Sequence, residues 1–227
     1  NNTKVLPARI PGKRQSGGKI EALLIEENNN GDWSAIVRKA GRIKQGERLE
    51  FCDGKLLAKA KERLEEGEWL LEFEETERLK ERLEDVGLPP LPPYIERRNA
   101  SDLQNTKDRE RYQTCFATEP GAISAPTAGL HFTPEILTEI GNRGIDILEV
   151  TLHVGLGTFS SIDQEDIRKH KMHAEFFSVS PQTLRQLQVY QNNNKQMINV
   201  GTTSVRVLET LVRQNFQESS GWTDIFI

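Results

Sequence analysis

The chain has 227 residues, 36% of them hydrophobic and 28% charged, which is typical of a soluble globular protein with one large or two modest domains. No stretch approaches the roughly 18 apolar residues of a membrane span, and the first residues lack the apolar core of a secretory signal. The net charge of −4 excludes a general polyanion binder but not a partner that meets a local basic cluster. Two cysteines without CxxC spacing indicate a reducing cytoplasm.

The first third of the chain predicts short β-strands separated by turns. Partial alternation in KIEALLIEE, from residue 19, precedes the turn cluster NNNGD and a second strand candidate, WSAIVRK. The pattern continues through KQGERLEF, the turn CDG, KLLAKAKER and EEGEWLLEFE. Short strands at this spacing indicate a small β-barrel.

A charged helix and a proline-rich break follow these strands. Residues 75–86 place Leu79 and Leu83 four apart, with Val86 three further on, and Gly87 stands where helices commonly end. LPPLPPYI, at residues 88–95, contains four prolines and favours a stiff extended segment. We interpret it as the boundary of the small barrel; an ordinary proline-rich connector is the alternative.

The second half mixes helices and strands. TPEILTEIGNRG predicts a helix capped by Thr133 with Pro134 in its first turn, and SVSPQTLRQLQVYQNN predicts one capped by Ser180. Between them, IDILEVTLHVGLGTF predicts a strand that ends in a glycine loop. QMINVGTTSVRVLETLV predicts a strand, a loop and a helix.

These elements predict a β-rich α+β protein of two domains. A small β-barrel domain is expected over residues 13–90, inserted into a larger domain. That main catalytic α+β domain, mixed and barrel-containing, is expected to be discontinuous and to consist of residues 1–12 and 91–227. Residues 1–12 should therefore pair with the second half.

All four histidines lie between positions 131 and 173, in or beside loops rich in glycine, threonine or charge. His131 lies near the end of SAPTAGLHFT, whose small residues contribute little burial. His153 begins the loop HVGLGTF, and His170 and His173 lie in HKMHAE. Independent structural histidines would scatter more widely. The loop VGTTSVR adds a strand-to-helix junction, where free backbone N–H groups suit an anion.

Each feature also has a structural interpretation. A single histidine is more often structural than catalytic, and GTTSVRVLETL could be a capped helix with Leu208 and Leu211 in the core. GLGTF lacks the third glycine of a dinucleotide-binding loop. The four histidines could bind a metal, but HxxH without the glutamate of the zincin arrangement is a weak signal. We therefore expect no metal.

Seven motifs in chain order carry a specific resemblance: LPPYI, RYQTCFA, APTAGLHFT, TLHVGLGTF, HKMHAEF, GTTSVRVLET and GWTDIFI. With them the chain closely resembles, essentially end to end, the S-adenosylmethionine:tRNA ribosyltransferase-isomerases of queuosine biosynthesis. NNTKVLPARI looks like a segment that normally lies well inside the family's chains. Two features depart from the family: Ser161-Ile162 replaces the usual Pro-Val pair, and the family's usual segments before NNT and after FI, the latter with an Asn-Phe-His stretch, are absent.

The resemblance implies that the ribosyl moiety of S-adenosylmethionine is transferred to the 7-aminomethyl-7-deazaguanine base at the tRNA wobble position and isomerised. The product would be epoxyqueuosine, with release of adenine and methionine. S-adenosylmethionine would be a consumed co-substrate, with no other cofactor and no membrane partner. The reaction needs a general base beside the sulfonium and a general acid for adenine, roles that suit histidine. The expected catalytic residues are His131, His153, His173 and Glu175. His131 or His153 is expected to transfer the proton, with Glu175 or His173 as its orienting partner.

Further residues are expected to hold the substrates. Small residues let a substrate approach the backbone closely, and the expected substrate-binding residues are Thr127, Gly129, Gly155, Gly157, Thr158, Thr202, Thr203 and Arg206. The basic segment 94–112 is expected to contact tRNA phosphates and stack on a base, through Arg97, Arg98, Lys107, Arg109, Arg111 and Tyr112. A solvated charged loop is the alternative for that segment. For the whole chain, the alternatives are a metal-dependent hydrolase and a non-catalytic RNA-binding module.

Overall fold

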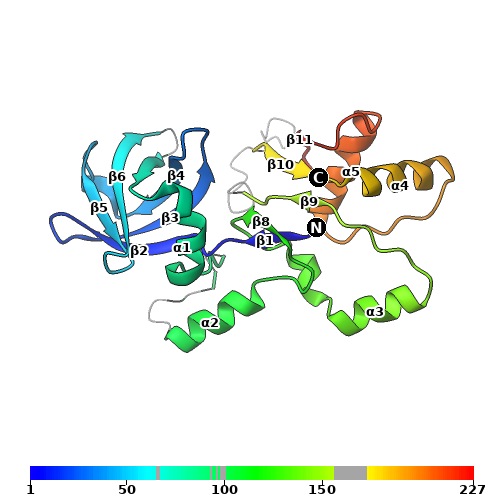
Figure 1. The fold of residues 1–227 in the computed structure, drawn as a ribbon, viewed down its shortest axis with the longest axis horizontal. Helices are drawn as coiled ribbons and strands as arrows, with labels where there is room; N and C mark the ends of the chain where they lie inside the picture. Colours follow the sequence, from blue (N-terminus) through cyan, green and yellow to red (C-terminus); the bar gives the residue numbers. More distant parts are fainter. Residues whose placement is uncertain (65–66, 93, 96, 98–100, 156–172) are drawn as a thin grey trace. The chain divides into compact units, whose positions relative to one another are not determined.

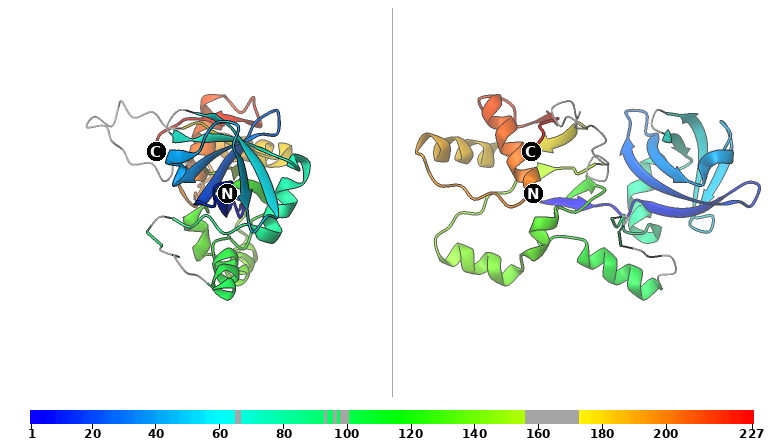
Figure 2. Two further views of the ribbon diagram at one scale, coloured as in Figure 1. Left: turned by 90° about the vertical axis from the view of Figure 1, so that its left-hand side faces the viewer. Right: turned by 180° about the vertical axis from the view of Figure 1, so that it is seen from behind.

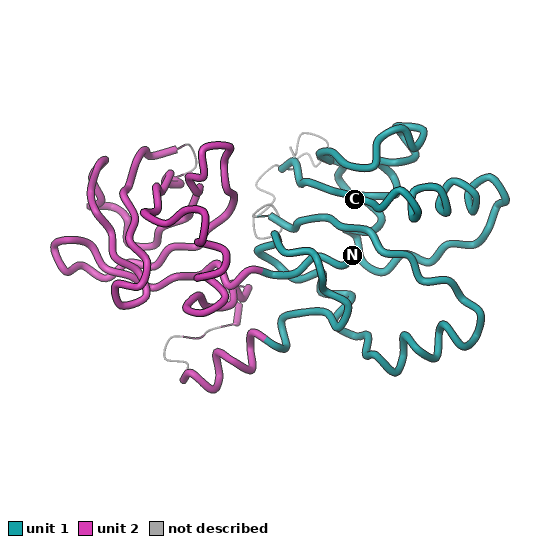
Figure 3. The backbone as a smooth tube through the Cα atoms, viewed as in Figure 1, with its two compact units in different colours: residues 1–5, 110–227 teal, residues 6–109 magenta. Residues whose placement is uncertain are grey.

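The structure is a computed structural model that describes residues 1–64, 67–92, 94–95, 97, 101–155 and 173–227 (Figure 1). The chain divides into two compact units (Figure 3). The main unit combines Asn1–Val5 with Glu110–Ile227, and the barrel unit is Leu6–Arg109. None of the described helices is long and apolar enough to cross a membrane.

Six antiparallel strands close the barrel unit in the order β2-β3-β4-β7-β6-β5 (Figure 2). Because successive side chains of a strand point to opposite faces, alternate residues fill the interior, and Ile10, Phe51 and Leu71 are fully buried there. The predicted small barrel is confirmed. Its strands are β2 (Arg9–Arg14), β3 (Lys19–Glu27), β4 (Trp33–Arg38), β5 (Arg48–Phe51), β6 (Leu56–Arg63) and β7 (Trp69–Phe73).

The predicted charged helix forms α1 (Leu79–Val86), after a 3-10 turn at Thr76–Arg78, and it buries Leu79 and Leu83. Gly87 ends the helix in extended backbone, with φ −72°, rather than in the left-handed conformation of a usual glycine cap. A Cβ at Gly87 would lie 1.9 Å from the carbonyl oxygen of Pro7. The close approach of the chain therefore requires this glycine.

Two small sheets build the main unit. Strand β1 (Thr3–Val5) pairs in parallel with β8 (Glu119–Ala122) across the whole insertion. Strands β9 (Thr151–Leu152), β10 (Glu175–Ser178) and β11 (Ser220–Thr223) form an antiparallel sheet with β10 in the middle. The structure is thus α+β and rich in sheet, as predicted. The main domain was also expected to contain a barrel, but the closed barrel formed by the described strands belongs to the inserted unit.

A 3-10 turn, η1 (Ala40–Arg42), follows β4. The chain after the barrel strands and α1 contains α2 (Asp102–Arg111), the 3-10 turn η4 (Thr127–His131), α3 (Pro134–Asn142), α4 (Pro181–Asn192) and α5 (Thr202–Arg213). The predicted caps of α3 and α4 are confirmed, because the hydroxyls of Thr133 and Ser180 accept from the backbone N–H groups of Ile136 and Thr183. The predicted strand in QMINV is wrong, because these residues have no regular structure and are mostly exposed.

The unit boundaries lie outside the predicted limits of 13 and 90 on both sides. Strand β2 begins at Arg9 and pairs with β3 and β5, so a boundary at residue 12 would divide it. On the other side, Arg109 donates to the carbonyl oxygens of Glu84 and Gly87, which join the segment up to residue 109 to the rest of the barrel unit. Within that segment, Arg97 binds Asp108.

Candidate functional site

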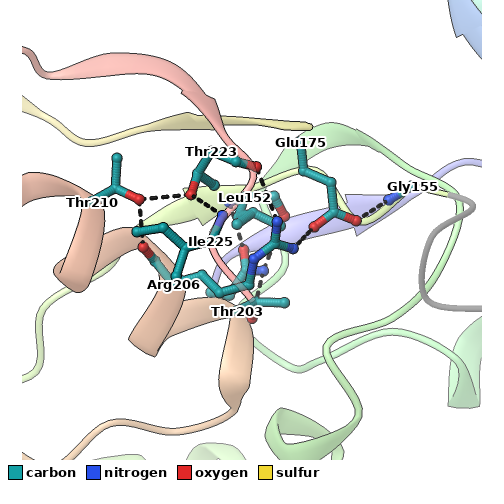
Figure 4. A network of polar contacts seen from close by, with 9 residues as sticks. Leu152, Gly155, Glu175, Thr203, Arg206, Thr210, Thr223 and Ile225 are labelled. Atoms are coloured by element: carbon teal, nitrogen blue, oxygen red, sulfur yellow. Dashed lines mark hydrogen bonds and ion pairs between the residues drawn. The ribbon is translucent and has the colours of Figure 1, made fainter. Parts of the chain in front are cut away.

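A buried carboxylate clamp lies where three of the motif loops meet (Figure 4). One oxygen of Glu175, at the start of β10, accepts from the Gly155 N–H at 2.8 Å, and the other pairs with the Arg206 guanidinium. Arg206, on α5, also donates to the carbonyl oxygen of Thr223 at 3.0 Å. The clamp therefore joins the glycine loop after β9 to β10, β11 and α5.

The clamp residues are almost fully withdrawn from water. Glu175 is 4% exposed and Arg206 is 5% exposed. Burying two charges is costly unless further hydrogen bonds satisfy them, and the contacts to Gly155 and Thr223 supply these. Among the described residues, the Nε of Arg206 is buried without a hydrogen-bond partner. These contacts hold the clamp in one arrangement. The guanidinium of Arg206 balances the negative charge of Glu175.

Asn1 ties the N-terminal segment to the same place. Its amide nitrogen donates to the carbonyl oxygen of Leu152 and to the hydroxyl of Thr203, both at 3.0 Å. Its amide oxygen accepts from the backbone N–H groups of Leu152 and Thr3, both at 3.1 Å. The start of α5 is thus held against the end of β9 by a side chain from the other end of the sequence.

The His153 ring is held by three neighbours. Its Nδ1 lies 2.8 Å from the hydroxyl oxygen of Thr3, with donor and acceptor set by the ring tautomer. The ring stacks on Phe176 at a centroid distance of 6.1 Å and an interplanar angle of 19°. A Cβ on Gly121 would lie 2.8 Å from the ring, so only glycine fits beneath it. This environment fixes the position of the imidazole.

His131 has a contrasting, exposed position at the end of η4. Gly129 is buried under this turn, where a Cβ would lie 2.8 Å from the Thr114 methyl group. A Cβ on Gly201, the residue before α5, would lie 3.5 Å from the Ala128 Cβ. The small residues therefore let the η4 turn rest against the start of α5.

The structure corrects one predicted role. Glu175 or His173 was expected to orient a catalytic histidine, but the two carboxylate oxygens of Glu175 bind Gly155 and Arg206. His173 is exposed just before β10. The hydroxyl of Thr3, and not Glu175, lies within hydrogen-bond distance of His153 Nδ1. The predicted contacts Gly157 and Thr158 lie outside the described residues, as does His170. Of the other predicted substrate contacts, Thr127 and Thr202 are exposed and Thr203 is half-buried.

Three of the predicted tRNA contacts already have partners within the protein. The Arg97 guanidinium binds Asp108 in a bidentate pair, at 2.6 and 3.2 Å, and Arg109 donates to backbone carbonyls. Tyr112 is 7% exposed, and its hydroxyl lies 3.1 Å from that of Ser124, so it is packed inside rather than available to a base. Arg98 lies outside the described residues. Lys107 and Arg111 are exposed on α2.

Residues 1–227 match the family model described as "Queuosine biosynthesis protein". The chain belongs to this family. Two curated relatives in the queuosine biosynthesis family are S-adenosylmethionine:tRNA ribosyltransferase-isomerases, from Staphylococcus epidermidis at 44% identity and Staphylococcus aureus at 43%. Each match covers 100% of this chain and 65% of the relative, so the chain spans about two thirds of the relatives' length.

A crystal structure of S-adenosylmethionine tRNA ribosyltransferase from Thermotoga maritima is also similar in sequence to this member of the queuosine biosynthesis family. The two are 27% identical over 99% of this chain and 58% of that one, with a TM-score of 0.33. Among the described residues, no group of three or more His, Cys, Asp or Glu side chains is arranged to hold a metal ion.

Sequence reasoning missed three polar residues of this queuosine biosynthesis family member, Asn1, Asn2 and Thr3. Asn2 accepts from the Thr151 hydroxyl at 2.7 Å and donates to Glu149 at 3.0 Å. Both Asn2 and Thr3 are buried. The only signal was a run of polar residues leading into an apolar stretch, which does not reveal partners some 150 positions away.

Proposed function

We propose that this protein transfers and isomerises the ribosyl moiety of S-adenosylmethionine onto the 7-aminomethyl-7-deazaguanine base at the tRNA wobble position, releasing adenine and methionine. The observation that carries the proposal is the family match over residues 1–227, together with relatives of 43–44% identity that bear this activity in their names. Because both substrates are cytoplasmic, we place the protein in the cytoplasm.

Proton transfer is the first task of the site. The sulfonium makes the adjacent ribose carbon acidic, so a base must remove its proton, and the departing adenine must receive one. His153 is our first candidate for one of these transfers, because Thr3, Gly121 and Phe176 fix its ring in place. His131 is the second, because it is exposed at the end of the η4 turn beside the start of α5.

The clamp and the start of α5 have supporting roles in this proposal. Glu175, paired with Arg206, holds the backbone N–H of Gly155, two residues after His153. The backbone N–H groups of Thr202 and Thr203 lie at the N-terminus of helix α5, a position that favours a carboxylate such as that of the methionine moiety. Small residues at Ala128 and Gly201 bring the η4 turn, which carries His131, close to the start of α5.

The experiment is a direct assay for adenine. The full-length protein is incubated with S-adenosylmethionine and tRNA that carries the aminomethyl deazaguanine base, and free adenine is measured; tRNA with guanine at that position is the matched control. We expect adenine only with the modified tRNA, in amounts equal to the ribosyl group gained. Tight tRNA binding without adenine would instead favour the RNA-binding module.

A second arm tests the metal-dependent hydrolase. We expect a chelator to leave adenine release unchanged. Activity lost to the chelator and restored by zinc would contradict the proposal. Neither the names of the relatives nor the described geometry favours this alternative.

A further inference from the structure

Three π side chains form a row across the sheet of the main unit. Phe176 on β10 lies opposite Trp222 on β11, and on its other side the backbone N–H of His153 donates to the Phe176 carbonyl oxygen at 3.0 Å. The side chains make contact in the same order. The rings of His153 and Phe176 stack at 6.1 Å, and those of Phe176 and Trp222 meet edge to face at 5.7 Å and 69°.

The row lies on the face of the sheet that helix α5 does not cover. Successive residues of a strand point to opposite faces, and on β10 Glu175 and Phe177 point toward α5. Phe177 shares one buried cluster with Val207 and Leu211 of α5, and Glu175 binds Arg206 of the same helix. Phe176 and Trp222 must therefore project from the opposite face.

The two ends of the row differ in exposure. At one end, His153 is half-buried and lies against Thr3 and Gly121. At the other end, Trp222 is 57% exposed on β11, an edge strand of the sheet. The other two tryptophans, Trp33 and Trp69, are 2% and 5% exposed in the barrel unit. An exposed indole that is separated from a candidate catalytic histidine by one aromatic ring is suited to stack on an aromatic ligand.

We propose that Trp222, braced by Phe176, is a stacking platform for an unpaired base of the tRNA, next to the base that reacts at His153. The inference rests on the proposed function. Sheets with exposed aromatic side chains bind single-stranded nucleic acid by stacking on its bases. A small donor such as S-adenosylmethionine would be largely enclosed by its pocket, whereas the indole at this edge is open. The occupant is therefore a base of the polymer.

The test compares Trp222→Ala with Trp222→Phe in the full-length protein, with Ile198→Ala as the control for loss of an exposed apolar side chain. Dissociation constants are measured separately for an anticodon stem-loop RNA and for S-adenosylmethionine. Stacking on an aromatic side chain is worth enough that Trp222→Ala should weaken RNA binding about 5- to 100-fold. Trp222→Phe should stay within about three-fold, and S-adenosylmethionine affinity should not change.

Fluorescence gives an independent readout of the same contact. Acrylamide should quench the Trp222 emission of the free protein, and the RNA should protect it, while the Trp222→Phe variant shows neither effect. If acrylamide does not quench Trp222 in the free protein, another part of the protein covers the indole and the inference is wrong. If Trp222→Ala weakens the binding of S-adenosylmethionine but not of RNA, Trp222 contacts the ribosyl donor and not a tRNA base.

The outcomes separate this inference from the proposed function. If the wild-type protein releases adenine and Trp222→Ala binds RNA normally, the platform is wrong and the function stands. If the wild-type protein releases no adenine but its RNA binding depends on Trp222, the function is wrong and the platform stands.

Discussion

Among the described histidines, His153 has a ring whose position is fixed by a hydroxyl, an aromatic face and a glycine. Replacing His153 with Gln keeps a polar side chain of similar reach near Thr3 but removes the imidazole that would give or take the proton. We expect turnover to fall at least about a hundred-fold, with melting within a few degrees of the wild type. Adenine release per folded molecule and calorimetry check this. If His153 were purely structural, His153→Gln would lower the melting temperature and leave turnover per folded molecule nearly intact. Normal turnover in a stable variant would make His131 the candidate for proton transfer.

Thr3 is a positioning residue in the same arrangement. Its hydroxyl also lies 3.4 Å from the Glu119 carbonyl oxygen, so it can bond to either ring tautomer of His153. Thr3→Val keeps the shape of the side chain and removes the hydroxyl. We expect a lower kcat and a shifted pH profile, with little change in the KM for S-adenosylmethionine. Thr3→Ser, which retains the hydroxyl, should keep the profile; a profile unchanged in Thr3→Val would contradict the role.

At the scale of elements, the Glu175–Arg206 clamp joins β10 to α5 and should dominate the stability of this junction. Glu175→Gln leaves the Arg206 charge buried without its partner, which typically costs about 3–5 kcal/mol. Glu139→Gln breaks the exposed pair with Arg143 on α3, where both side chains are more than 60% exposed, and should cost less than about 1 kcal/mol. Urea unfolding compares the two variants, and equal losses would contradict the assignment.

The barrel contains an ion pair with a predictable pH dependence. Arg14 on β2 donates two hydrogen bonds of 2.9 Å to Glu47, just before β5, and this bond holds the pKa of Glu47 below its ordinary value of 4.5. A carboxyl whose pKa is lowered by folding stabilises the fold above its unfolded pKa and loses that contribution as the pH falls through the folded pKa.

We therefore expect the stability of the barrel unit to fall as the pH drops below about 4.5. Glu47→Gln should cost about 2 kcal/mol at neutral pH and flatten this part of the pH curve. Glu74→Gln, which removes the partner of the exposed Arg48, is the control and should leave both unchanged. Chemical unfolding at a series of pH values measures the effect. If the unfolding free energy of Glu47→Gln fell with pH as steeply as that of the wild type, other carboxyl groups would be the cause of the acid sensitivity.

The elements that the sequence predicts well are those whose causes are local. The caps Thr133 and Ser180 act within three residues, and the barrel strands alternate over short windows. The strand expected around residues 145–159 is regular, in its described part, only at Thr151–Leu152. An apolar run gives propensity, but a strand also needs partners, and those of Leu152 lie on β10 and in Asn1.

The same distinction applies to the candidate site. Motif loops identified His153, Glu175 and Arg206, but not which of them contact each other. The Thr3–His153 contact spans 150 positions, and the Glu175–Arg206 pair spans 31. Such pairings follow from the strand order of the folded sheet, which no local pattern contains. The interpretation of Glu175 as a partner of histidine failed for this reason.

On the scale of the whole molecule, the main unit consists of two segments separated by the barrel unit. Strand β1 finds its partner β8 more than a hundred residues later, so the two segments must come together after the barrel unit has been synthesised. The barrel unit is contiguous and has its own closed sheet. The short N-terminal segment, through Asn1 and Thr3, then supplies contacts that the longer segment lacks.

Binding of a whole tRNA should depend on the exposed cations of α2. Lys107 and Arg111 are four residues apart and therefore lie on one face of the helix, and both are exposed. Arg97 already binds Asp108 and is the matched control.

Each phosphate contact adds about 0.7–0.9 to the slope of log K against log salt. Replacing Lys107 and Arg111 together with Ala should lower that slope by about 1.5 and weaken binding to all tRNAs alike, whereas Arg97→Ala should leave the slope unchanged. Titrations of tRNA at several salt concentrations measure it. An unchanged slope in the double variant would remove α2 from the tRNA interface, and a reduced slope in Arg97→Ala would show that the pair with Asp108 opens to bind a phosphate.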